Sequence, residues 1–279
     1  MITIVLLALS ALAAPVANPL NKFKNYFVIV FENQNYDTVL NNAYMGKVLP
    51  SKGRLLTNYH GVTHPSQPNY IAMTSGSPKG VFLDFHANVD KRNLADNLED
   101  IGKTWKTYQQ DYPQDQGCFL SDQGDYYRKH NPFVSYVNVH NNPNRCANIV
   151  NAKFLDQDIA NKKLPDYMFY TPNIKNDGHN TDIDYASNWL QGFLEPLLEN
   201  PVFDDTLFVI TFDESNAALG VIDFKGNHIY TLLLGKSVTP GSQDSTYYTH
   251  YSQIATLNEQ WGMSMFNLDD YGAAGFDLQ

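Results

Sequence analysis

The residues best suited to chemistry lie in the segment Thr63–Tyr70, which reads THPSQPNY. Pro68 is favoured in the first turn of a helix, because the N–H it lacks has no partner there. We therefore expect a helix to begin near Ser66 and to end before Gly76. N–H groups and the positive end of the helix dipole would surround the Ser66 hydroxyl, which suits a phosphate or a serine alkoxide. Alternatively, Ser66 only caps the helix.

Four further residues offer hard oxygen ligands directly after two apolar runs of strand length, 26–31 and 206–211. They are Glu32, Asn33, Asp213 and Glu214. Such ligands suit Mg²⁺, Mn²⁺ or Ca²⁺ better than a soft-ligand zinc cage, although an added histidine would permit Zn²⁺. We expect one divalent ion at these residues. The alternative is that Glu32 and Asp213 are ordinary helix caps.

Two histidines occupy comparable positions. His179 follows a predicted strand and the turn signal Asn176–Gly178, and His250 opens the last predicted helix. Each also has a simpler interpretation, an exposed ring for His179 and a local hydrogen bond for His250. His130 is assigned no role. HExxH, paired CxxC, P-loop, GxGxxG and GxSxG motifs are absent, which leaves metalloprotease, NTPase, dinucleotide-binding and lipase-type esterase functions without support.

Strand and helix patterns alternate along the chain. Apolar runs predict strands at 26–31, 55–62, 105–108, 166–170, 206–211 and 228–234, and helices are expected at 93–102, 183–197 and 249–263. Thr181 is the expected cap of the second helix. The pattern predicts an α/β fold with a doubly wound, mostly parallel sheet and helices on both faces. The polar clusters would then meet at the carboxyl ends of the strands. Residues 109–150 are irregular, and we interpret them as a surface excursion.

The N-terminal residues 1–13 are apolar, short and end in an Ala-x-Ala pattern, which predicts a signal peptide and secretion. A buried strand is the alternative. Residues 14–279 would form one domain with no membrane-spanning segment. Cys118 and Cys146 are the only cysteines and suggest one disulfide, the alternative being two separate thiols. A net charge of −10 argues against nucleic acid as a partner.

Several segments, in this order, resemble one phosphoesterase family, which contains fungal secreted acid phosphatases, a secreted mycobacterial acid phosphatase and bacterial phospholipases C. They are Val30–Asp37, Thr63–Gly76, Thr171–Asn180, Thr211–Ser215 and His250–Ser252. Residues 128–133 and 145–146 are most similar to the fungal enzymes. The resemblance implies an alkaline-phosphatase-like fold.

The resemblance also implies roles for individual residues. Ser66 would be the nucleophile, beside a metal held by Glu32, Asn33, Asp213 and Glu214. His179 and His250 would bind phosphate or assist the leaving group, and Asn33 would also touch the phosphate. Superfamily members with two metals have an aspartate several residues ahead of a histidine. Here Asn173 stands at that place, Asp177 is closely spaced to His179, and Asp213 is followed by Glu214 rather than a histidine. We therefore expect one metal rather than two, and a metal-free enzyme is the alternative.

The implied function is a secreted acid phosphatase that hydrolyses small phosphate monoesters, phosphoinositides among them, through a phosphoserine. One alternative is a phosphodiesterase of the phospholipase C kind. The other is an inactive secreted protein that binds phosphate or glycan.

Overall fold

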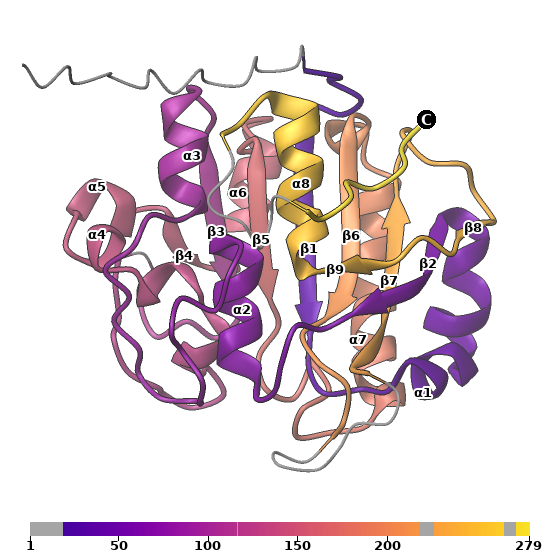
Figure 1. The fold of residues 1–279 in the computed structure, drawn as a ribbon, viewed down its shortest axis with the longest axis horizontal. Helices are drawn as coiled ribbons and strands as arrows, with labels where there is room; N and C mark the ends of the chain where they lie inside the picture. Colours follow the sequence, from indigo (N-terminus) through magenta and orange to yellow (C-terminus); the bar gives the residue numbers. More distant parts are fainter. Residues whose placement is uncertain (1–18, 116, 218–225, 265–271) are drawn as a thin grey trace, which may run out of the picture.

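The computed structural model describes residues 19–115, 117–217, 226–264 and 272–279. The predicted signal peptide at 1–13 lies outside the described residues. A nine-stranded sheet forms the centre of the described part, with helices packed on both of its faces (Figure 1).

The strands of the sheet run mostly parallel, as predicted. Their order is β4-β3-β5-β1-β6-β7-β2-β8, and β9 pairs with β2. Their bounds are β1 Asn25–Phe31, β2 Arg54–His60, β3 Trp105–Gln109, β4 Ile149–Asn151, β5 Tyr167–Thr171, β6 Thr206–Phe212, β7 His228–Leu234, β8 Ser242–Asp244 and β9 Tyr248–Thr249. Among these described strands only β7 is antiparallel to its neighbours, β6 and β2. Every residue of β1 and β6 is buried, which explains their continuous apolar sequences.

Side chains of β1 alternate between the two helical layers. The Tyr26 hydroxyl bonds Gln253 of α8 (His250–Trp261) at 3.1 Å, whereas the Phe31 ring lies 6.0 Å from the ring of Trp189 in α7 (Ile183–Leu198). Helix α2 (Ser66–Ser75) packs beside α8 (Figure 1). Residues of opposite parity in a strand face opposite ways, so a strand this apolar requires cover on both faces.

The remaining helices are short. They are α1 Tyr36–Asn41, η1 Ala43–Val48, η2 Leu49–Lys52, α3 Leu94–Asp100, η3 Arg128–His130, η4 Phe133–Ser135, α4 Val137–His140, α5 Pro143–Cys146, α6 Phe154–Ala160 and η5 Pro201–Phe203. The predicted cap of α7 is wrong by one residue. Asp182 accepts the N–H of Tyr185 at 2.9 Å, while the Thr181 hydroxyl donates to the Lys175 carbonyl. No helix among the described residues is both long and apolar enough to cross a membrane.

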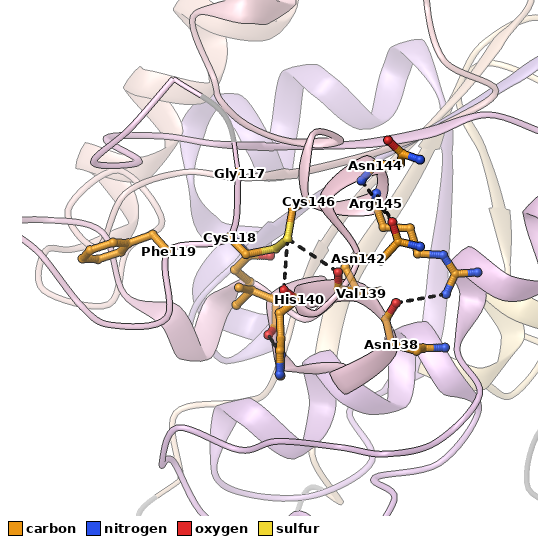
Figure 2. Close-up of a disulfide and its surroundings, with 12 residues drawn as sticks. Gly117, Cys118, Phe119, Asn138, Val139, His140, Asn142, Asn144, Arg145 and Cys146 are labelled. Atoms are coloured by element: carbon orange, nitrogen blue, oxygen red, sulfur yellow. Dashed lines mark hydrogen bonds between the residues drawn. A yellow bond between two sulfur atoms is a disulfide. The ribbon is translucent and has the colours of Figure 1, made fainter.

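The interpretation of residues 109–150 as a surface excursion is wrong in part. This segment adds β4 to the edge of the sheet and buries Tyr126, Phe133 and Tyr136 in the core. Its large aromatic side chains explain the difference, because they find apolar partners without any helical or strand periodicity. The predicted disulfide between Cys118 and Cys146 is present, with a Cα–Cα distance of 5.1 Å, and joins the start of the segment to α5 (Figure 2).

Candidate active site

The site lies at the carboxyl ends of the central strands, where three chain segments meet. Glu32 follows β1, Glu214 follows β6, and Ser66 is the first residue of α2. The Ser66 hydroxyl lies 3.0 Å from Glu32 Oε2 and 3.1 Å from Glu214 Oε1. Since the hydroxyl carries one proton, it donates to one of these carboxylates at a time. All three side chains are buried, so the serine faces acceptors that can take its proton.

Ser66 does not cap its helix. Pro65 occupies the N-cap position and makes no side-chain cap bond. The N–H of Gln67, the next residue, donates to Asp84 Oδ1 at 2.8 Å, so this backbone donor already has a partner in a neighbouring loop. The Ser66 hydroxyl is therefore directed to the acidic residues rather than to the backbone. This geometry favours the chemical interpretation of Ser66 over the capping interpretation.

Glu32 is the centre of the acidic cluster and is fully buried. Its Oε1 accepts the hydroxyl proton of Tyr70 at 2.5 Å, and His130 Nε2 lies 3.2 Å from the same oxygen. Burial raises the pKa of Glu32 to about 8, against the lowering effects of the Lys129 charge and the Tyr70 hydrogen bond. A buried carboxylate with so raised a pKa needs a proton or a compensating cation.

His130 and Asp177 join the site. The sequence interpretation gave His130 no role and considered Asp177 only as a substitute ligand of a second metal. His130 Nδ1 lies 3.4 Å from Asp177 Oδ2, so the imidazole stands between Asp177 and Glu32. Suitable atoms of these three residues all lie within 4.8 Å of one another. Burial lowers the pKa of His130, which keeps the ring neutral and able to bind a metal. Asp177 lies with His179 in the loop after β5, and this position was the sequence signal that could have placed it in the site. His130 lies in a segment without helical or strand periodicity, so no such signal was available for it.

The donor atoms of the cluster fit a divalent cation. Several buried polar atoms of the described residues make no hydrogen bond, and four of them belong to this cluster: Asn33 Oδ1, Asp177 Oδ2, Asp213 Oδ2 and His130 Nε2. Burial, Glu32 and Glu214 raise the pKa of Asp213, whose Oδ1 accepts the Asn33 N–H at 3.3 Å. A hard or borderline cation binds to such atoms, which are buried oxygens and an imidazole nitrogen without hydrogen bonds, among closely spaced carboxylates.

The two predicted site histidines differ in exposure: His179 lies at the rim of the site, whereas His250 is buried. The His179 N–H donates to Asp177 Oδ1 at 2.8 Å, and its ring is 6.1 Å from that of His130. Its Nδ1 lies 2.8 Å from the side-chain oxygen of Asn180 at the exposed rim. His179 is thus close enough to the cluster to meet a bound substrate.

His250 is fully buried behind the acidic residues. Its Nε2 lies 2.6 Å from the Asp213 carbonyl and must carry the proton, so Nδ1 accepts from the Tyr59 hydroxyl at 3.3 Å. Burial lowers the pKa of His250 to about 4 and keeps the ring neutral. With both nitrogens bonded to protein, His250 positions Asp213, and the geometry does not favour direct contact with phosphate.

His64 completes the surroundings of the serine. Its Nδ1 pairs with Glu214 Oε2, the oxygen that does not face Ser66. The sequence interpretation gave His64 no role, although it lies in the same segment as the serine. Glu214 is therefore held in place from both sides.

The fold defines the class of protein. A protein of the alkaline phosphatase superfamily from Vibrio parahaemolyticus superimposes with a TM-score of 0.61, at 16% identity, over 88% of this chain and 69% of that one. Residues 39–264 match the model of the Phosphoesterase family. The chain belongs to the Phosphoesterase family, and the predicted alkaline-phosphatase-like fold is confirmed.

Two relatives extend the comparison. An acid phosphatase of Aspergillus fumigatus is 40% identical over 265 residues, covering 90% of this chain and 58% of the relative. A phosphatidylinositol-3-phosphatase of Mycobacterium tuberculosis is 28% identical over 251 residues, covering 88% of this chain and 80% of the relative. The chain spans about three fifths of the length of the fungal acid phosphatases that it matches.

Proposed function

We propose that this protein is an acid phosphatase that hydrolyses phosphate monoesters with Ser66 as the nucleophile. The observation that carries the proposal is the buried Ser66 hydroxyl at 3.0 Å from Glu32 and 3.1 Å from Glu214, at the start of α2. Membership in the Phosphoesterase family supports hydrolysis at phosphorus. The fungal relatives named acid phosphatase support the monoester class.

The reaction proceeds in two displacements. Ser66 Oγ forms a bond to phosphorus as its proton passes to Glu32 or Glu214, and the bond from phosphorus to the alcohol oxygen breaks. The departing oxygen takes up a proton, for which His179 at the rim is the candidate donor. Water then attacks the phosphoserine and gives a proton to His179, which lost one in the first step. The bond from phosphorus to Oγ breaks, Oγ takes its proton back from the glutamate, and phosphate leaves. Glu214, paired with His64, is fixed in the orientation that proton transfer requires.

A divalent cation belongs to this proposal. Glu32 would hold it together with His130 and Asp177, whose ligand atoms lie within 4.8 Å of one another and of Glu32. The other ligands predicted from the sequence, Asn33, Asp213 and Glu214, belong to the same acidic cluster. The bound cation supplies positive charge for the phosphate oxygens and lowers the pKa of the serine hydroxyl. Without it, the crowded carboxylates would repel an anionic substrate.

We propose phosphoinositides as one substrate group, because the Mycobacterium tuberculosis relative is a phosphatidylinositol-3-phosphatase. Secretion is supported by the disulfide between Cys118 and Cys146, since such bonds persist in oxidising compartments. Residues 14–279 are proposed as a single phosphoesterase domain.

The test compares phenyl phosphate with diphenyl phosphate, using the parent protein, Ser66→Ala and Ser75→Ala. Ser75 is the matched control, because it lies at the other end of α2 and bonds the Ile71 carbonyl. We expect monoester turnover in the parent and in Ser75→Ala, with a loss of about a thousandfold or more in Ser66→Ala. Preference for the diester would favour the phospholipase C alternative. Phosphate binding without turnover would favour an inactive binding protein, and full activity in Ser66→Ala would refute the nucleophile.

A further inference from the structure

We propose that a pocket next to Ser66 receives the alcohol part of the substrate, and that it selects neutral, ring-bearing alcohols. The inference rests on the proposed function and specifies its substrate class. The pocket has a volume of about 460 Å³, within the range of small-molecule sites. Its lining residues are Asp84, Phe85, His86, Asp122, Tyr127 and Lys129.

Two contacts attach this pocket to the reacting centre. On one side, Asp84 Oδ1 accepts the Gln67 N–H at 2.8 Å, and the Phe85 N–H donates to Gln67 Oε1 at 3.2 Å. Gln67 is the residue after Ser66, so this wall is tied to the nucleophile's own helical turn. On the other side, the Tyr127 ring lies 6.3 Å from the ring of His130, which is within the acidic cluster. The alcohol part of a phosphate ester bound at Ser66 would therefore have this pocket within its reach.

The walls of the pocket suit a ring. The Phe85 side chain is 51% exposed although its backbone is anchored, and Tyr127 is half-buried. An aromatic ring that packs against such side chains gains an interaction beyond the area that it buries. The hydrogen bond of its main-chain N–H thus keeps the exposed Phe85 ring in position. A loop residue that only faced solvent would not need this bond.

The charges of the pocket disfavour a second anionic group on the alcohol. Lys129 is its one lysine or arginine, and its Nζ is already paired with Asp84 Oδ2 at 2.8 Å. Asp122 lies 3.2 Å from His86 at the outer rim. Two aspartates therefore face one lysine, so a carboxylate or second phosphate on the alcohol meets net negative charge. This argues for monoesters whose only charge is the phosphate itself.

The experiment measures both turnover and binding in the parent, Phe85→Ala and Phe82→Ala. Phe82 is the matched control, because it is 72% exposed, lies in the same loop and does not line the pocket. For turnover the substrates are phenyl phosphate and ethyl phosphate. For binding, calorimetry uses phenylphosphonate, 4-carboxyphenylphosphonate and methylphosphonate, which the enzyme does not need to hydrolyse.

We expect Phe85→Ala to raise the KM for phenyl phosphate about fivefold while ethyl phosphate changes less than twofold, and Phe82→Ala to alter neither. The parent should bind phenylphosphonate several-fold more tightly than the other two phosphonates, and Phe85→Ala should remove that preference over methylphosphonate. Equal effects of Phe85→Ala on both esters, or equal binding of the three phosphonates, would overturn the pocket assignment. Ring-selective binding without turnover of either ester would retain the pocket and refute the proposed phosphatase activity.

Discussion

Tyr70→Phe offers the sharpest test of the acidic cluster. The Tyr70 hydroxyl donates to Glu32 Oε1 at 2.5 Å, and both side chains are fully buried, so water cannot replace the lost bond. A hydrogen bond to a charged acceptor contributes about 1.5–3 kcal/mol, which corresponds to about ten- to hundredfold in an equilibrium constant. Because this bond lowers the pKa of Glu32, its removal also lets a proton compete better with a cation. We expect Mn²⁺ affinity to fall by about ten- to hundredfold.

Calorimetric titration of the metal-free protein with Mn²⁺ measures this effect. Tyr136→Phe is the control, because its buried hydroxyl contacts Thr74 Oγ1 at 2.7 Å and the Ile71 carbonyl at 3.2 Å, and no carboxylate. The control should bind Mn²⁺ as the parent does, and saturating metal should restore most of the activity of Tyr70→Phe. Mn²⁺ affinity within twofold of the parent in Tyr70→Phe would refute the assignment of Glu32 as a metal-binding carboxylate supported by Tyr70.

Three further predictions concern stability and are measured by urea denaturation. Replacing Cys118 and Cys146 together by alanine should lower the free energy of unfolding by about 3–4 kcal/mol, as the 28-residue separation implies; an unchanged midpoint would contradict this. Leu190→Ala, at a fully buried position of α7, should lower it by about 2–5 kcal/mol, and a loss below about 1 kcal/mol would mean that the helix is not packed as described. Burial opposes ionisation of Asp166, but hydrogen bonds from Lys103 and Thr104 outweigh it and hold its pKa below the ordinary value. This carboxylate therefore stabilises the fold above the unfolded pKa of about 3.9 and stops doing so as pH falls through the folded pKa. Asp166→Asn should lower the free energy of unfolding by about 1 kcal/mol at pH 7, and the loss should shrink below about pH 4. A loss that does not depend on pH would rule out the ion pair as its cause.

The sheet was predictable because its central strands carry a local signal. β1 and β6 are buried on both faces, and that environment requires an uninterrupted apolar run. The residues that follow such strands share one edge of the sheet, so Glu32 and Asp213 could be expected to lie together before any contact was known.

The rest of the site depends on contacts that no local pattern encodes. His130 lies beside Glu32 because a disulfide closes its segment and because the His130 carbonyl accepts a hydrogen bond from the Thr171 hydroxyl at 3.0 Å. The cap of α7 is Asp182 rather than the predicted Thr181. These adjacent residues are both able to cap a helix, and tertiary packing determines which of them does so. The direct role expected of His250 stays a prediction, and no local pattern indicated that both of its ring nitrogens would be bonded, one to the Tyr59 hydroxyl and the other to the Asp213 carbonyl.

The disulfide has a consequence for the acidic cluster and the pocket. The loop between Cys118 and Cys146 carries His130 at the acidic cluster and Tyr127 and Lys129 at the pocket. Before the two thiols are oxidised, these side chains are kept near Ser66 by non-covalent contacts alone, such as the hydrogen bond from the Thr171 hydroxyl to the His130 carbonyl. Reduction should therefore loosen the acidic cluster and the pocket together, because both draw side chains from one disulfide-closed loop.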